Sequence, residues 1–385
     1  MDCTVKRHYI AVLLLIFCPH ASFAENSTLR FSQACDKGQQ VVIAAMGDLL
    51  FHRPLQMKAS TMGYDSLWKE ALPFIDHADI TYANLEGPIA SGIDPSGNSV
   101  SDPNRFDYAV YSDFPTFNYH PRLAQDLKKS GFTIVSTANN HALDRRAIGV
   151  DKTIDILDSK NVLHVGSRKS GSQAPFYTTI ERNGMKIAWI ACTEHTNGFD
   201  DKEHQIRYCY KSEDKKWILD TIAKLKGSVD AIIIAPHWGS EYQEQANSTQ
   251  RAFAHAVLEA GASAVIGSHP HVLQEVEKYT TKDNRQTLIS YSLGNFVSFQ
   301  GSTRTRSTMI LLVGLTKTTK GTIINGVRFV PMVMLNRNGT QQIHLSKLNK
   351  DEVHLSAFGY ISRAIPKGNA LFNLPIVTNP ECGGR

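Results

Sequence analysis

The sequence predicts an α/β protein with mixed sheets flanked by helices and a β-rich C-terminal part, all in one domain. Short apolar runs alternate with helical patterns through most of the chain, and this alternation is typical of α/β folds. After Phe296 two long β-rich runs follow each other and predict antiparallel strands. No Pro- or Ser-rich linker divides the 385 residues, although a chain of this length fits two ordinary domains or one large one.

The predicted strands are runs so apolar that we expect them to be buried in a sheet. In chain order they are 41–46, 80–83, 132–136, 187–191, 231–235, 264–266 and 287–291, followed by the antiparallel pair 308–316 and 322–335.

The predicted helices lie between these strands and have recognisable ends. Segment 121–130 begins at a proline and is followed by Gly131, and segments 215–226 and 249–260 are each followed directly by glycine, a helix stop signal. Segment 142–159 has the apolar spacing of a helix. In contrast, 90–119 is dense in Gly, Pro, Asn, Asp and Ser, which predicts a long surface excursion.

The first 24 residues predict a secretory signal peptide. Lys6 and Arg7 precede an apolar core at 10–17, and Ser22 and Ala24 provide a small-x-small cleavage site. The apolar run is too short to span a bilayer, although an uncleaved anchor is the alternative. We therefore expect residues 25–385 to form the mature domain, exported to the periplasm or secreted, with no membrane span after cleavage.

Cysteine usage agrees with export. Cleavage would leave Cys35, Cys192, Cys209 and Cys382, and an even number of cysteines in an oxidising compartment favours disulfides. Of the three possible connectivities we favour Cys192–Cys209, which closes a short loop, and Cys35–Cys382, which ties the termini together. Four unpaired buried thiols are the alternative.

Charge and motif content exclude several functions. The formal net charge of +5 is small for this length and gives no case for nucleic-acid binding, which needs a concentrated basic face. The sequence has neither a G-x-x-x-x-G-K-[ST] phosphate loop nor a G-x-S-x-G nucleophile elbow. ATP-driven polymerisation and serine-based acyl transfer are therefore not expected.

Side chains that can bind metal follow the predicted strands, at the edge where open α/β sheets bind ligands. They are Asp48, His52, Glu86, Asn140, His141, His237, His269 and His271. Imidazole and carboxylate together suit Zn²⁺, Mn²⁺ or Fe ions. Pro270 favours extended backbone, which would send both flanking imidazoles to one side. A single histidine after a strand is commonly structural, but five with two carboxylates predict a metal site.

These residues belong to a series of motifs that resembles the CapA-type family. In order the motifs are Gly47-Asp48-x-x-x-His52, Asn84-Leu85-Glu86, Ala138-Asn139-Asn140-His141, His237-Trp238-Gly239-Ser240-Glu241-Tyr242, Gly267-x-His269-Pro270-His271-Val272 and Tyr291-Ser292-Leu293-Gly294-Asn295-Phe296. The CapA-type family is associated with synthesis of poly-γ-glutamate capsule and belongs to the metallo-dependent phosphatase (calcineurin-like) superfamily. The resemblance implies a metallophosphoesterase-like α/β sandwich.

The resemblance also implies a site for two divalent transition-metal ions, Mn, Fe or Zn. Its ligands would be Asp48, His52 and His271 for the first ion, Asn140, His237 and His269 for the second, and Glu86 between them. Glu86 stands where the superfamily has an aspartate. Asp48-x-x-x-His52 is wider than the superfamily's Asp-x-His, so His52 could contact substrate instead.

His141 matches the superfamily histidine that is not a ligand and protonates a leaving group. Histidine suits this role because its pKa lies near neutrality. Asp144 follows three residues later, and on a helix the two would share a face. Asp144 would then orient the imidazole or cap the helix.

Five further residues are candidates for substrate binding. Glu241 and Tyr242 could support the metal-binding histidines or only shape a turn, and Asn295 could line the pocket. Arg304 and Arg306 could bind an anionic group or be solvated loop charges. The aromatic residues of 90–119 could form a wall facing the substrate or pack beneath the loop.

Three functions remain open. The first is an exported dinuclear hydrolase acting on phosphoesters in cell-envelope or capsule metabolism. The second is a non-phosphatase accessory of poly-γ-glutamate or capsule assembly, and the third is metal-assisted chemistry at a peptide or amide. The expected partners are an anionic small-molecule or polymer substrate and capsule or envelope assembly proteins, with no nucleic acid.

Overall fold

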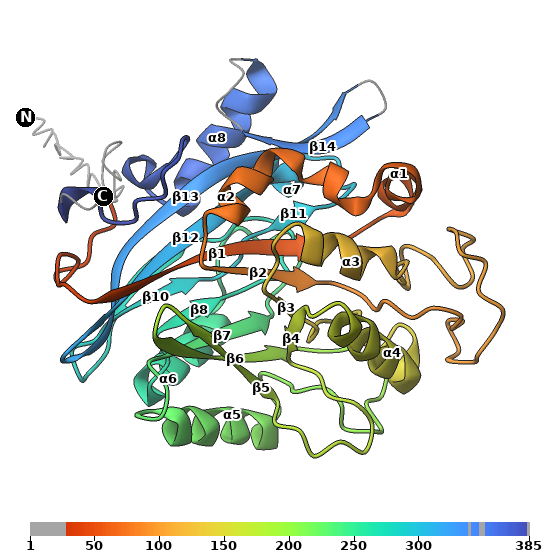
Figure 1. The fold of residues 1–385 in the computed structure, drawn as a ribbon, viewed down its shortest axis with the longest axis horizontal. Helices are drawn as coiled ribbons and strands as arrows, with labels where there is room; N and C mark the ends of the chain where they lie inside the picture. Colours follow the sequence, from red (N-terminus) through yellow and green to blue (C-terminus); the bar gives the residue numbers. More distant parts are fainter. Residues whose placement is uncertain (1–27, 338–339, 346–350, 383–385) are drawn as a thin grey trace, which may run out of the picture.

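The computed structural model describes residues 28–337, 340–345 and 351–382, which form two mixed β-sheets covered by helices (Figure 1). The predicted fold class is confirmed. The predicted signal peptide lies outside the described residues. Within the described ranges no helix has both the length and the apolar character needed to cross a membrane.

The first sheet has the order β14-β13-β12-β1-β2-β3-β4, with β11 paired to β1 outside that path. Its strands β1 to β4 run parallel, whereas β12 to β14 run antiparallel. The bounds are β1 (Gln39–Leu49), β2 (Ile80–Leu85), β3 (Ile134–Ser136), β4 (Leu163–Val165), β11 (Asn295–Val297), β12 (Ser307–Thr318), β13 (Gly321–Arg337) and β14 (Thr340–Leu345).

The second sheet has the order β5-β6-β7-β8-β10-β9. Its four central strands are parallel, and the edge strands β5 and β9 are antiparallel to their neighbours. The bounds are β5 (Tyr177–Arg182), β6 (Met185–Thr193), β7 (Ala231–His237), β8 (Ala264–Ile266), β9 (Val276–Thr280) and β10 (Gln286–Ser290). All the predicted strands are present, and β4, β5, β9, β11 and β14 are additional.

The inner faces of the two sheets share one hydrophobic core because alternate residues of a strand point to the same face. Ile43 of β1, Ile187 of β6 and Ile233 of β7 all belong to this core. The rings of Tyr82 and Trp189 stack with centroids 5.0 Å apart and so join β2 to β6. The sheets therefore form the two inner layers of a sandwich.

Helices cover the outer faces. Residues of α1, α2, α3 and α4 pack on the first sheet, and residues of α5 and α6 pack on the second (Figure 1). The bounds are α1 (Arg53–Met62), α2 (Leu72–Asp76), α3 (Arg122–Lys129), α4 (Arg146–Ser159), α5 (Ser212–Leu225), α6 (Ser248–Ala260), α7 (Thr303–Arg306) and α8 (Glu352–Ala364). The three helices predicted with stop signals are α3, α5 and α6.

The predicted start of the helix at residue 142 is wrong. α4 begins at Arg146, whose φ of 58° is left-handed, so the chain from His141 to Arg145 forms turns instead. Arg145 is fully buried and donates hydrogen bonds to the carbonyls of Ile93, Val110 and Phe117. This one guanidinium therefore holds the 90–119 excursion, which has no helix or named strand, against the fold.

Both predicted disulfides are present. Cys35–Cys382 joins the two ends of the described chain, and Cys192–Cys209 closes a loop at the end of β6. A disulfide stabilises a fold mainly by restricting the unfolded chain. Both the Cys35–Cys382 and the Cys192–Cys209 connectivity agree with an oxidising compartment.

Candidate metal centre

The predicted ligands lie where the carboxyl ends of the two sheets meet. Asp48 is near the end of β1, Glu86 follows β2 and Asn140 lies in the turn after β3. From the second sheet, His237 ends β7, and His269 follows β8. Parallel strands present their carboxyl ends at one edge, which explains why residues so far apart in sequence converge.

Two glycines allow the strands to approach closely at this edge. A Cβ added to Gly47 would lie 1.8 Å from the carbonyl oxygen of Gly294, and one added to Gly267 would lie 2.1 Å from that of Tyr291. No side chain fits such gaps. Gly47 immediately precedes Asp48, so the close approach places a ligand directly beside β11.

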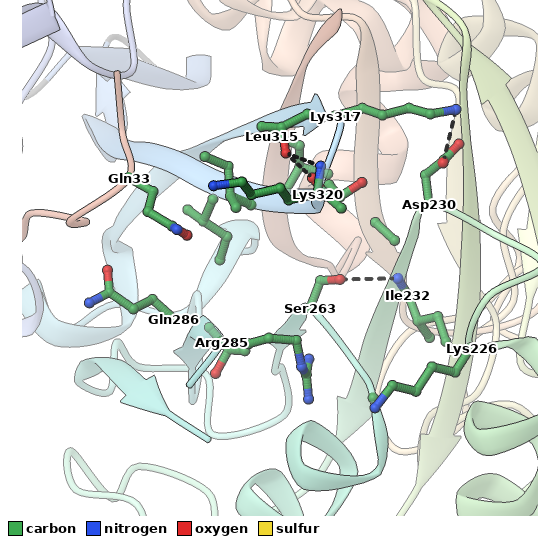
Figure 2. Close-up of a pocket in the computed structure, with 18 of the residues that line it drawn as sticks. Gln33, Lys226, Asp230, Ile232, Ser263, Arg285, Gln286, Leu315, Lys317 and Lys320 are labelled. Atoms are coloured by element: carbon green, nitrogen blue, oxygen red, sulfur yellow. Dashed lines mark hydrogen bonds and ion pairs between the residues drawn. The ribbon is translucent and has the colours of Figure 1, made fainter. Parts of the chain in front are cut away.

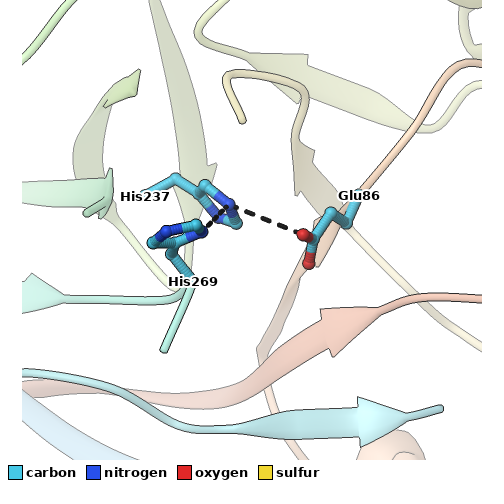
Figure 3. Close-up of side chains that lie close together, drawn as sticks. All are labelled: Glu86, His237 and His269. Carbon is cyan, nitrogen blue, oxygen red and sulfur yellow. Dashed lines mark hydrogen bonds and ion pairs between the residues drawn. The ribbon is translucent and has the colours of Figure 1, made fainter. Parts of the chain in front are cut away.

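Five of the predicted ligands form two overlapping sets of potential metal donors. Glu86, His237 and His269 each offer an atom within 4.8 Å of the others, and so do Asp48, Glu86 and His271. Figure 3 shows the imidazoles of His237 and His269 facing the Glu86 carboxylate. Glu86 is common to both sets, and Asn140 joins the first because its Oδ1 lies 2.9 Å from His237 Nε2.

Glu86 gives the strongest physical indication that this cluster suits a cation. Its side chain is fully buried, and neither carboxylate oxygen has a hydrogen-bond partner. Leaving one buried polar group unsatisfied costs roughly 1–3 kcal/mol, and more for a charged one. Divalent ions on either side would satisfy both oxygens, so the residues present fit a metal centre.

The electrostatics of the cluster agree with this fit. Burial, together with the nearby charge of Asp48, raises the pKa of Glu86 well above its ordinary value. Burial lowers the pKa of His237 and His269 well below the usual value, so both imidazoles are neutral and able to bind metal. Burial acts in the same direction on His271, but the Glu86 and Asp48 carboxylates raise its pKa to about 9.

Neighbouring polar groups fix the orientation of the ligands. Asn84 donates a hydrogen bond of 2.8 Å to Asp48 Oδ1, and Ser268 Oγ lies 2.9 Å from His237 Nδ1. The opposite nitrogen of His237, Nε2, lies 3.6 Å from Glu86 Oε1. Such outer hydrogen bonds hold a metal-binding imidazole in one orientation.

The backbone at His269-Pro270-His271 is not extended as predicted. The φ angles are 101° at His269 and 57° at His271, both in the region that favours glycine. Both imidazoles nevertheless face the cluster, with ring centroids 6.0 Å apart. Strain of this kind costs of order 1–3 kcal/mol per residue and is concentrated at functional sites.

His141 and Asp144 are in direct contact although the helix starts later than predicted. His141 Nδ1 lies 2.7 Å from Asp144 Oδ2, which also accepts a 2.6 Å hydrogen bond from the Phe117 backbone. The N-cap of α4 is Arg145, without a side-chain cap. Asp144 therefore orients the imidazole and does not cap the helix. His141 belongs to neither donor set.

His52 is not brought into either donor set. It is the N-cap residue of α1, its ring packs edge-on against Phe117, and its Nδ1 accepts a hydrogen bond from the Phe299 backbone at 3.3 Å. Burial lowers its pKa to about 4. The alternative left open by the sequence, a contact with substrate, is the one that this position favours.

The five predicted substrate residues differ in their surroundings. Asn295 is buried, and its Oδ1 lies 3.0 Å from His271 Nδ1, so it supports a ligand. Tyr242 is 43% exposed, with its ring centroid 6.1 Å from that of His271, and Glu241 beside it is exposed. Arg304 pairs with Glu244 at 3.0 Å, and Arg306 is the last residue of the short helix α7.

Several residues beside the centre were not among the site residues predicted from the sequence. Asn84 and Ser268 hold ligands, as described above. His195 packs edge-on against His269 with ring centroids 5.3 Å apart. Asn197 accepts a hydrogen bond from Asn140, and its Nδ2 lies 3.4 Å from His141 Nδ1. His195 and Asn197 follow β6 just as the predicted ligands follow their strands, so the same positional pattern could have identified them.

A cavity of about 720 Å³ lies away from this centre. Figure 2 shows it lined by Lys226, Asp230, Arg285 and Lys317, at the amino ends of β7 and β10. It contains no predicted site residue. Several of its charged side chains form ion pairs, as Lys317 does with Asp230 at 3.0 Å. This cavity therefore does not coincide with the predicted ligands.

The fold and the centre define a class: an α/β protein whose two mixed sheets join at a buried cluster of histidines and carboxylates that could hold metal. Residues 42–300, more than half of the chain, match the family described as bacterial capsule synthesis protein PGA_cap. The chain belongs to this family, and the predicted CapA-type membership is confirmed.

The chain is also similar to individual proteins. It is 26% identical to the capsule biosynthesis protein CapA of Bacillus anthracis, over 83% of this chain and 73% of that protein. It is 29% identical to the PGA biosynthesis protein CapA of Bacillus subtilis (strain 168), over 72% and 68%. A solved structure, the calcineurin-like phosphoesterase YfkN from Bacillus subtilis, has a TM-score of 0.46 and 14% identity, over 85% of this chain and 98% of that one.

Proposed function

We propose that this protein is an exported, divalent-metal-dependent hydrolase that acts on a phosphoester in capsule or cell-envelope metabolism. The observation that carries the proposal is the pair of unpartnered, buried oxygens of Glu86, shared by two sets of potential ligands. The capsule part of the proposal follows from the family and from the CapA relatives. The two disulfides support export.

The residues divide into two sets of metal ligands and one proton donor. Asp48, Glu86 and His271 would hold one ion, and Glu86, Asn140, His237 and His269 would hold the other. When bound, two divalent cations supply Lewis-acid chemistry that polarises a phosphoryl oxygen and stabilises charge in the transition state. Such ions also neutralise the buried charge of Glu86.

His141 would donate a proton to the leaving oxygen from Nε2, because Asp144 occupies Nδ1 at 2.7 Å. The carboxylate stabilises the protonated imidazole and fixes the ring. Only 6% of His141 is exposed, so bulk water does not compete freely for the proton. Exposed Tyr242 and half-buried His52 would contact the part of the substrate that remains outside.

The test is an assay of purified protein on aryl phosphate monoesters and diesters, with Mn²⁺ and after chelation. We expect Mn²⁺-dependent hydrolysis of at least one ester class, abolished by EDTA. An arm with a γ-glutamyl anilide tests metal-assisted amide chemistry, the third function that the sequence left open. Metal-dependent cleavage of the anilide without cleavage of any ester would overturn the phosphoester assignment.

A further inference from the structure

We infer that Asn197, in the loop after β6, is a positioning residue that determines which end of the Asn140 amide faces the metal centre. The inference rests on the proposed function, because it takes Asn140 as a ligand. An asparagine amide has one carbonyl oxygen, which can bind a cation, and one NH₂ group, which only donates. An amide turned the wrong way would present donors to the cation and could not bind it.

Both ends of the Asn140 amide have a partner in the structure. Oδ1 lies 2.9 Å from His237 Nε2, on the side of the cluster, whereas Nδ2 donates to Asn197 Oδ1 at 3.3 Å. Asn140 is 2% exposed, so water does not satisfy its NH₂ group. The acceptor supplied by Asn197 is therefore what directs the NH₂ group outward and the oxygen inward.

The same side chain also reaches the proposed acid. Asn197 Nδ2 lies 3.4 Å from Nδ1 and 3.5 Å from Nε2 of His141. One amide thus connects a ligand of the metal centre with the adjacent proton donor. Asn197 is exposed, so packing in the core does not explain these contacts.

The loop that carries Asn197 is fixed to the second sheet. The backbone N–H of Glu194 donates to the His237 carbonyl at 2.9 Å, and Glu194 Oε2 accepts from the Gly239 N–H at 2.8 Å. The Cys192–Cys209 disulfide closes the base of the loop. Asn197 has a φ of 49°, a conformation that asparagine adopts more readily than most residues.

The experiment compares two substitutions that tolerate this φ. Asn197→Gly removes the whole amide, whereas Asn197→Asp keeps an oxygen to accept from Asn140 and loses the donor near His141. Asn161→Gly is the matched control, since Asn161 also has a left-handed φ, of 56°, and follows α4 away from the centre. Mn²⁺ affinity is measured by calorimetry, and kcat and KM are measured on an aryl phosphate.

Asn197→Gly should weaken the affinity for Mn²⁺ about 10- to 100-fold, the usual effect of losing an outer hydrogen-bond partner of a ligand. Asn197→Asp should bind Mn²⁺ at least as tightly as the wild type. Its kcat should nevertheless be lower, because the donor near His141 is lost, and its KM should be unchanged. Asn161→Gly should match the wild type in both readouts.

Two results would overturn the inference while the proposed function stands. One is wild-type Mn²⁺ affinity in Asn197→Gly. The other is equal loss of affinity in Asn197→Gly and Asn197→Asp, because the retained oxygen would then not matter. If the wild type itself binds no Mn²⁺, the proposed function fails and this inference fails with it.

Discussion

The two ends of the sheet sandwich differ in the way that their charged side chains are arranged. At the amino ends of β7 and β10 lies a cavity of about 720 Å³, where Lys317 pairs with Asp230 at 3.0 Å and Lys226 with Asp283 at 3.4 Å. At the carboxyl ends lies a closely packed cluster in which neither oxygen of Glu86 has a hydrogen-bond partner. The contrast shows that the predicted ligands surround a buried carboxyl group without hydrogen bonds and do not line the cavity.

The largest effect should come from removing the shared carboxylate. Glu86→Gln keeps the side-chain shape and removes the charge, so Mn²⁺ binding and hydrolysis should both be lost. The loss should exceed the roughly 10- to 100-fold typical of an outer partner. Because neither oxygen of the buried Glu86 carboxyl group has a hydrogen-bond partner, metal-free Glu86→Gln should unfold at no lower temperature than the metal-free wild type.

The control for Glu86→Gln is Asp230→Asn at the opposite end, which makes the same chemical change beside a paired lysine. It should leave metal content and hydrolysis as in the wild type. Equal loss of metal in the two variants would remove the distinction between the two ends.

Removing the proposed acid should have the next largest effect. His141→Ala should lower kcat about 10²- to 10⁴-fold, the usual contribution of general acid catalysis, on esters with poor leaving groups. Metal content should stay normal because His141 belongs to neither donor set. Elemental analysis beside kcat measures both.

Esters with acidic leaving groups should be affected less by His141→Ala, since they need little protonation. Asp144→Asn should lower kcat in the same direction, because the amide cannot stabilise a protonated imidazole. A His141→Ala protein that has lost its metal would show that His141 is a ligand and that its assigned role is wrong.

A smaller effect is expected on stability. A ligand that binds one site of only the folded state stabilises it by about 2.7 kcal/mol at 100 times its Kd, so Mn²⁺ at that concentration should raise the unfolding free energy by about this amount for each ion bound. Denaturant titration with Mn²⁺ and with EDTA measures the difference. Mn²⁺ should stabilise Asp230→Asn as much as it stabilises the wild type. Any stabilisation of Glu86→Gln by Mn²⁺ would contradict the assignment of Glu86 as the ligand shared by the two donor sets.

The smallest effect should follow from breaking an ion pair at the opposite end. Lys317 and Asp230 keep 38% and 21% of their side chains exposed, and exposed pairs contribute roughly 0–1 kcal/mol. Lys317→Ala should therefore change the unfolding free energy by no more than about 1 kcal/mol, with normal Mn²⁺ binding. A loss of hydrolysis in Lys317→Ala would show that the cavity at the amino ends of β7 and β10 takes part in the chemistry.

The sequence could predict most of the ligand set because position along a strand determines position in the sheet. Asp48, Glu86 and His237 each stand at the carboxyl end of a buried apolar run, and parallel strands bring such ends together. The disulfides could be predicted because only three pairings were possible.

What the sequence could not predict depends on contacts between distant segments. The left-handed φ at His269 opposes the local preference, and only the surrounding structure can hold it there. His52 is only four residues from Asp48, yet the chain turns into α1 at that point and takes it out of the donor sets. Asn197 gains its role from Asn140, which is 57 residues away.

The most direct test of the shared Glu86 carboxylate is the number of metal ions per chain. Purified protein, loaded with Mn²⁺ and freed of unbound ions, is analysed for metal and protein concentration. The two donor sets joined by Glu86 predict close to two ions per chain in the wild type. Protein that retains no metal after loading would contradict the assignment of these residues as a metal centre.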